Sequence, residues 1–329
     1  MNFTRRLSAK TIGVSSALIT LIIWTAFIVI ARASAQRTLS PFDIALARLV
    51  GAALVLLPWG WWLVRRDAQR SPAGQVRPRS LFGLSPLSFR VSVSLGFFGG
   101  FLHAAIVNSG YVYAPAAHAS VLMPGSLPLW TSLLSVLILG SRITPARGLG
   151  LLLIFLGDLL VGGASLLQAL AGGEVWKGDL LFIAAAICWS AYTVLVRHYA
   201  VDPVRATIAL TVFGLFSYVP VYAVLVLSQV IASQLLVAPL AEVLFQLVFQ
   251  GLCTGVISSI TFTKMVQYFG PVRSTMITAL VPGLSALGAV IFLDEPLSWN
   301  LIVGLALVTF GILFGVRSSL SPDLTRSQP

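Results

Sequence analysis

The sequence predicts an all-α integral membrane protein whose ten transmembrane helices form a 5+5 inverted repeat. Three observations lead to this fold class: an apolar composition, ten apolar runs of bilayer length, and a resemblance between the two halves of the chain. Of the 329 residues, 57% are hydrophobic and 9% are charged, and the mean hydropathy is +0.95. Soluble domains carry about 25% charged residues, so these charges are too few to cover a surface in water.

Apolar runs long enough to cross a bilayer occur ten times along the chain. They lie near 12–31, 42–62, 91–112, 115–139, 147–166, 179–197, 206–230, 243–267, 271–293 and 299–316. The first run follows basic residues, as the apolar part of a signal peptide does, but it exceeds the about 7–15 residues of such a segment. We therefore expect it to remain in the mature protein as the first helix.

The basic residues predict the orientation of these spans. If the N-terminus is cytoplasmic, 17 of the 21 Lys and Arg residues fall in cytoplasmic segments, and only Arg32, Arg37 and Lys177 fall outside. This asymmetry is the positive-inside pattern, so we expect both termini and the loop 63–90 in the cytoplasm. The net charge of +11 is thus explained by a membrane surface, and no nucleic-acid partner is expected. The expected location is the plasma membrane, as a bacterial inner-membrane protein.

The two halves of the sequence resemble each other, with one five-span repeat over 13–166 and another over 178–317. A shift of 165 or 154 residues aligns Gly13 with Gly178, Trp24 with Trp189, Arg32 with Arg197, Pro128 with Pro282, Gly150 with Gly304 and Gly157 with Gly311. Because five is an odd number of spans, the second copy must be inverted in the membrane. Inverted repeats are typical of secondary transporters, whose substrate sites lie near the midplane between the repeats.

The glycines of spans five and ten predict a close helix contact. Gly150 and Gly157 are seven residues apart, as are Gly304 and Gly311, so each pair lies on one helix face. Small residues allow backbones to approach where lipid offers no hydrophobic drive for helices to associate.

Three stretches carry a resemblance to a known family: WTAF at 24–27, WSAYTVLVR at 189–197 and FLDEPLSWNLIVGLALVTFGILFG at 292–315. With these stretches the chain resembles the EamA-type members of the drug/metabolite transporter superfamily. The resemblance implies a secondary transporter, commonly an exporter, of a small organic metabolite such as an amino acid or drug-like compound, working by alternating access. The family usually has a glutamate at this position in each half. The first half of this chain has Ser141 there, and only the second half has the glutamate, as Glu295.

Asp158 is a carboxylate in an otherwise apolar stretch, residues 151–163. It lies about 16 Å into span five, near the centre of the bilayer core. It is either a proton-coupling group, or a partner for a cation, or a protonated acid that bonds a neighbouring helix. Arg48, within span two, is a possible charge partner for Asp158 or for a carboxylate, or an interfacial arginine that reaches the headgroups.

Trp24 and Trp189 occupy equivalent mid-span positions, where an aromatic belt residue is not expected. We expect them to line a shared substrate cavity, with packing as the alternative, and Tyr192 lies one turn beyond Trp189 on the same face. His103 and Asn108 in span three are further cavity candidates, and the alternative is hydrogen bonding between helices. His118, Ser120 and Ser274 are polar residues of the same kind in spans four and nine.

Pro128 and Pro282 are expected to mark kinks or hinges in spans four and nine. No Walker A motif is present, so ATP is not expected as the direct energy source. No catalytic residues, cofactor or metal are predicted, and Cys188 and Cys253 show no disulfide or metal pattern. A passive channel and an intramembrane lipid-linked group transferase are the alternatives to a transporter. The expected partners are a small-molecule substrate and the lipid bilayer, and the sequence leaves a homodimer open.

Overall fold

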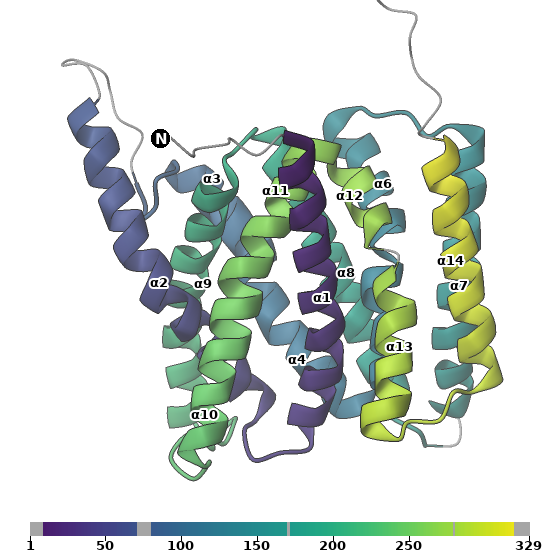
Figure 1. Cartoon of the computed structure of the whole chain (residues 1–329). Coiled ribbons are helices and arrows are strands. Elements are labelled where there is room, and N and C mark those ends of the chain that lie inside the picture. Colours follow the sequence, from purple (N-terminus) through teal and green to yellow (C-terminus); the bar gives the residue numbers. More distant parts are fainter. Residues whose placement is uncertain (1–8, 71–79, 170–171, 279, 319–329) are drawn as a thin grey trace, which may run out of the picture.

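The chain forms a bundle of membrane-length helices (Figure 1). The computed structural model describes residues 9–70, 80–169, 172–278 and 280–318, and no named β-strand occurs in these ranges. The spans that are single helices are α1 (Ala9–Ala35), α2 (Pro41–Arg70), α7 (Pro145–Ala169), α8 (Val175–His198), α9 (Pro203–Leu227) and α14 (Trp299–Ser318).

The other spans are broken into shorter helices. The third consists of α3 (Phe89–Gly96), η1 (Phe97–Leu102) and α4 (His103–Tyr113), and the fourth of α5 (Ala116–Ser120), η2 (Val121–Gly125) and α6 (Leu127–Leu139). The eighth consists of α10 (Leu240–Gln246), η3 (Leu247–Ser258) and α11 (Ser259–Phe269), and the ninth of α12 (Pro271–Ile277) and α13 (Leu280–Leu293). The η segments are π-helical, a backbone form that often occurs at functional sites.

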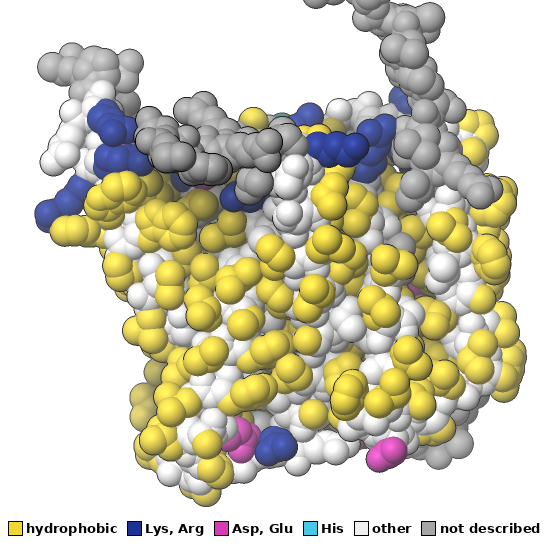
Figure 2. All heavy atoms as spheres, viewed as in Figure 1, with side chains coloured by type: hydrophobic (Ala, Val, Ile, Leu, Met, Phe, Trp, Pro, Cys, Tyr) yellow, Lys and Arg dark blue, Asp and Glu magenta, His cyan; other side chains and the backbone are white. Residues whose placement is uncertain are grey.

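The helices have the length and composition of membrane spans. Within the described ranges, nine spans are long and apolar enough to cross a bilayer, and the tenth is a shorter apolar helix over Trp299–Phe314. Hydrophobic side chains cover the sides of the bundle, whereas Lys and Arg gather at one end (Figure 2). The predicted fold class, an all-α integral membrane protein with ten helices, is confirmed.

The two ends of the bundle differ in charge, and we name them accordingly. The basic face carries Arg65, Arg205 and Arg273, and α1 begins there. The acidic face, at the opposite end, carries Glu174 and Glu242.

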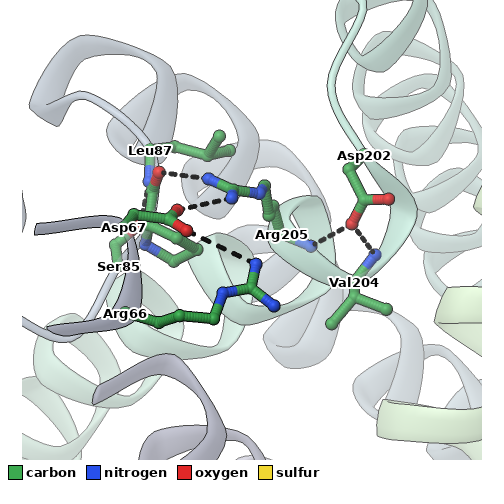
Figure 3. Close-up of polar contacts among 8 residues, drawn as sticks. Arg66, Asp67, Ser85, Leu87, Asp202, Val204 and Arg205 are labelled. Atoms are coloured by element: carbon green, nitrogen blue, oxygen red, sulfur yellow. Dashed lines mark hydrogen bonds and ion pairs between the residues drawn. The ribbon is translucent and has the colours of Figure 1, made fainter. Parts of the chain in front are cut away.

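A cluster of charged residues ties α2 to α9 at the basic face (Figure 3). Arg205 pairs with Asp67 and also donates from Nη1 to the carbonyl oxygen of Pro86 at 3.4 Å. Arg66 lies 3.4 Å from the other oxygen of Asp67. Asp202 caps α9 by accepting from the two backbone N–H groups that lie two and three residues further along, at 3.0 and 3.1 Å. The cluster fixes the end of α2 against the start of α9.

Helices α7 and α14 cross through the four glycines that the sequence singled out. A Cβ on Gly157 would lie 2.7 Å from the carbonyl oxygen of Gly304, and one on Gly311 would lie 2.5 Å from that of Gly150. The helices are therefore antiparallel, and the predicted close approach is confirmed. The repeat exchanges the two contacts, because it maps Gly150 onto Gly304 and Gly157 onto Gly311.

A second pair of crossings follows the same relation between the halves. Gly51 of α2 meets Gly251 of η3, and Gly214 of α9 meets Gly100 of η1. A Cβ on Gly51 would lie 3.0 Å from the Cα of Gly251, and one on Gly214 would lie 3.4 Å from the Cα of Gly100. Span two of each half thus packs on the third span of the other half, as an inverted repeat requires.

Candidate functional site

A central cavity lies between the two halves, near the middle of the bundle. Its free space, counted with the part that is open to the outside, is about 490 Å³. Its lining comes from both halves: Trp24, Phe27, Ile28, Arg48, His103, Met123, Pro124 and Leu127 from the first, and Trp189, Thr254, Ser258 and Val281 from the second. This lining is mainly apolar, as it is in most binding pockets for small molecules.

Backbone breaks place several of these residues. Pro124 lies within η2 and has no N–H to donate, so a regular helix cannot continue through it. The Ser126 hydroxyl donates to the carbonyl oxygen of Leu122 at 2.7 Å, next to this break. In a membrane such side-chain bonds satisfy backbone groups that a broken helix leaves free. Pro124 itself was not singled out from the sequence.

Aromatic rings form the wall of the cavity nearest the basic face. Trp24 and Trp189 meet edge to face with ring centroids 5.9 Å apart, and Phe262 stacks on Trp24 at 4.9 Å. The ring of His103 lies 4.9 Å from that of Trp189. The Trp24 Nε1–H donates to Ser258 Oγ at 2.8 Å, which fixes the indole in the wall. Trp24, Trp189 and His103 therefore lie together in the lining of the cavity.

Two other cavity candidates, Tyr192 and Asn108, bond within the protein. The Tyr192 hydroxyl is 3.0 Å from Thr263 Oγ1, and its ring packs on Trp189 with centroids 5.1 Å apart. Asn108 donates to the carbonyl oxygen of Ala104 on its own helix at 3.1 Å. Neither residue is among those that line the central cavity.

Arg48 is the charged residue of the cavity lining. Its side chain is buried, with 8% of the residue exposed, and its Cζ lies 5.8 Å from the centroid of the Phe27 ring. Among the described residues, its guanidinium has no ion-pair or hydrogen-bond partner. His103 Nδ1 and Trp189 Nε1 are likewise buried without a hydrogen-bond partner among the described residues.

Asp158 lies in a different pocket, between α6, α7 and α8. Trp130, Trp176 and Asp179 share this pocket with it. Asp158 Oδ1 and Trp130 Nε1 are both buried without a hydrogen-bond partner among the described residues. Since Arg48 lines the central cavity and Asp158 this peripheral one, the pairing of Arg48 with Asp158 that the sequence left open does not occur.

An ion pair lies between the central cavity and the acidic face. Arg32 Nε donates to Glu295 Oε1 at 2.8 Å, and Arg32 Nη1 donates to the carbonyl oxygen of Tyr111 at 2.8 Å. The same carboxylate oxygen accepts from the backbone N–H of Ala116 at 3.4 Å. These bonds join α1, the junction of spans three and four, and the loop after α13. Sequence reasoning noted both charged residues but did not pair them.

Pro128 and Pro282 each lie in the first turn of a helix that follows a break. Pro128 is the second residue of α6, and Pro282 is the third residue of α13. Both prolines therefore follow an interruption of their span, and their role as hinges stays a prediction. His118 contacts Asp179 at 2.9 Å, Ser120 bonds its own helix, and Ser274 Oγ is buried without a partner among the described residues. In the part of the chain that is described, no group of three His, Cys, Asp or Glu residues could hold a metal ion.

Comparisons with known proteins agree with this architecture. An uncharacterized transporter of Archaeoglobus fulgidus is 26% identical over 225 residues, which cover 68% of this chain and 76% of the relative. A crystal structure of another protein aligns with a TM-score of 0.56 at 22% identity, covering 92% of this chain and 98% of its own, which shows a shared fold alone. The profile of the EamA-like transporter family matches residues 11–163 and 176–317. Because these two matches span most of the sequence, the chain belongs to the EamA-like transporter family.

Proposed function

We propose that this membrane transporter is a secondary carrier that exports a small organic metabolite through the central cavity. The observation that carries the proposal is that both halves of an inverted repeat line this one cavity. Rocking of the two halves around it would expose the same site to each side of the membrane in turn. The direction of transport rests on the common role of the family.

Different contacts close the cavity on its two sides, and this supports alternating access. Toward the acidic face, the Arg32–Glu295 ion pair joins separate spans. Toward the basic face, Trp24, Trp189 and Phe262 pack together. Each closure must open for a substrate to leave on that side, so the two sets of contacts are the gates of the proposed cycle.

The orientation in the membrane is part of the proposal. We expect the basic face in the cytoplasm, because Lys and Arg are retained on that side of a bilayer. Figure 2 shows how these side chains gather at that face of the bundle. Both chain termini would then be cytoplasmic, in the plasma membrane of a bacterium.

Asp158 is the proposed site of proton coupling. It is buried in the membrane part of α7, and one of its oxygens has no hydrogen-bond partner among the described residues. Intramembrane carboxylates commonly serve proton relays. Since Asp158 is outside the central cavity, coupling would act through the packing of α7 against α6 and α8 rather than by contact with substrate.

Counterflow in liposomes tests the proposal. Purified protein is reconstituted in vesicles loaded with an unlabelled test compound, and uptake of the labelled compound is followed. A carrier gives saturable uptake with a transient overshoot, because internal compound returns the site to the outer side. A passive channel gives uptake that neither saturates nor responds to the internal load.

A further inference from the structure

We propose that the substrate of the central cavity is an organic monoanion, a carboxylic acid with a small flat apolar body, and that Arg48 binds its carboxylate. This inference rests on the proposed function, because it names the substrate class of the same cavity. Three features carry it: a buried cation without a counter-charge, polar atoms without partners beside it, and a wall of aromatic rings.

The first feature is the charge of Arg48. Its side chain faces the cavity from α2 at 8% exposure, and the Phe27 ring beneath it offers only a weak cation–π contact at 5.8 Å. A charged side chain that is buried in a membrane protein is strongly destabilising unless it is paired. An anion in the cavity would supply the missing partner.

The acidic residues between the cavity and the acidic face have partners of their own. Glu242 accepts from the backbone N–H of Leu39 at 3.1 Å, and Glu295 accepts from Arg32. Asp43, on the same helix as Arg48, accepts hydrogen bonds from Ser40, Tyr222, Ser233 and Gln234. Within the described residues, the other titratable side chain that lines the cavity is His103, which supplies no negative charge.

The shape of the Arg48 guanidinium favours a carboxylate as the charged group of the substrate. Its planar set of N–H donors matches the two oxygens of a carboxylate, and such paired bonds are among the strongest in proteins. Ser258 Oγ already accepts from Trp24, so its own proton remains available for a ligand. His103 Nδ1 and Trp189 Nε1 add two further polar atoms that lack partners among the described residues.

The charge balance excludes other classes of substrate. No carboxylate lines the described cavity, so the ammonium group of an amine or an amino acid would enter without a counter-charge. A dianion would meet only one fixed cation. The indole rings of Trp24 and Trp189 in the cavity lining suit a flat apolar body. A monocarboxylic acid satisfies all of these conditions.

A matched series of compounds tests the headgroup. Phenylacetate, phenylacetamide, phenethylamine and phenylalanine share one ring and differ in charge: anion, neutral, cation and zwitterion. Thermal unfolding of the purified protein is measured with each compound at millimolar concentration. We expect phenylacetate to raise the melting temperature and the other three to have smaller effects.

Two variants assign the effect to Arg48. Arg48→Gln keeps the length of the side chain and removes its charge, so it should weaken phenylacetate binding about ten- to hundredfold. Without compound, this variant should be at least as stable as the wild type, because a buried unpaired charge has been removed. Arg37→Gln removes a charge from an exposed position and should leave phenylacetate binding unchanged.

The outcomes separate this inference from the proposed function. Equal shifts with all four compounds, a larger shift with phenethylamine, or no shift with any of them overturns the anion assignment. Lower stability of Arg48→Gln without compound also overturns it, since Arg48 would then be held by the protein itself. Counterflow of phenethylamine without counterflow of phenylacetate would retain the carrier and reject the anion. Stabilisation by phenylacetate without counterflow would retain the anion and reject the carrier.

Discussion

Trp24 and Trp189, which hold equivalent positions in the two halves, meet edge to face with ring centroids 5.9 Å apart in the wall of the central cavity. The two indoles differ in their hydrogen bonding. Trp24 Nε1 donates to Ser258, whereas Trp189 Nε1 has no partner among the described residues. This difference in hydrogen bonding predicts that replacing the two tryptophans has different effects.

Replacing each tryptophan by phenylalanine should therefore have different effects on stability. Both variants lose buried ring volume, and Trp24→Phe also loses a hydrogen bond, so it should be less stable than Trp189→Phe by about 1 kcal/mol. Both variants should weaken substrate binding if the indoles face the substrate. Thermal unfolding and counterflow measure the two properties, and unchanged counterflow in both variants would leave only the packing role.

Breaking the Arg32–Glu295 pair should favour opening toward the acidic face. A partly exposed ion pair contributes about 0.2–1 kcal/mol, so Glu295→Gln should shift the balance of conformations up to about fivefold. Labelling of a cysteine at Ser258 by an impermeant reagent applied at the acidic face should become faster by that factor. Slower or unchanged labelling would mean that the pair does not hold this side closed.

Asp158→Asn should separate coupling from binding. The amide keeps the size of the side chain but cannot ionise, so transport driven by a pH gradient should be lost while counterflow at equal pH is partly retained. If Asp158→Asn still concentrates substrate against its gradient at the wild-type rate, the carboxylate has a structural role and another residue couples the proton.

The crossing of α7 and α14 should not tolerate a side chain at its glycines. Gly157→Ala would place a Cβ 2.7 Å from the carbonyl oxygen of Gly304 and should lower the melting temperature by several degrees. Gly148→Ala, on the same helix, meets its nearest atom at 4.0 Å and should be neutral or slightly stabilising. A similar loss of stability in both variants would contradict the close crossing.

The orientation can be tested by labelling from outside intact cells. In a variant with Cys188 and Cys253 replaced by alanine, a cysteine at Glu174 should react with an impermeant reagent, whereas one at Arg70 should be protected. Both positions are exposed at opposite ends of the bundle. The reverse pattern would place the basic face outside.

The sequence predicted the spans and the glycine crossing because both follow from local composition and spacing. It could not say which side of each helix faces the cavity, because most spans are apolar on all sides. Arg48 could therefore be read as an interfacial residue, and only the packing of α2 against η3 directs it inward. The Arg32–Glu295 pair joins residues that are 263 apart in the sequence, so the fold alone brings them together. The surroundings of Asp158 also depend on the fold, because α6 and α8 form the separate pocket around it.

The central claim is that one site in the middle of the membrane is reached from each side in turn. The most direct measurement is the labelling of Ser258→Cys, without native cysteines, by an impermeant reagent added at either face of oriented liposomes. Alternating access predicts that reagent at either face eventually labels the whole population, at a rate set by conformational exchange, while the vesicles remain sealed to ions. Immediate labelling from both faces with ion leakage, or labelling from one face only, would contradict the account.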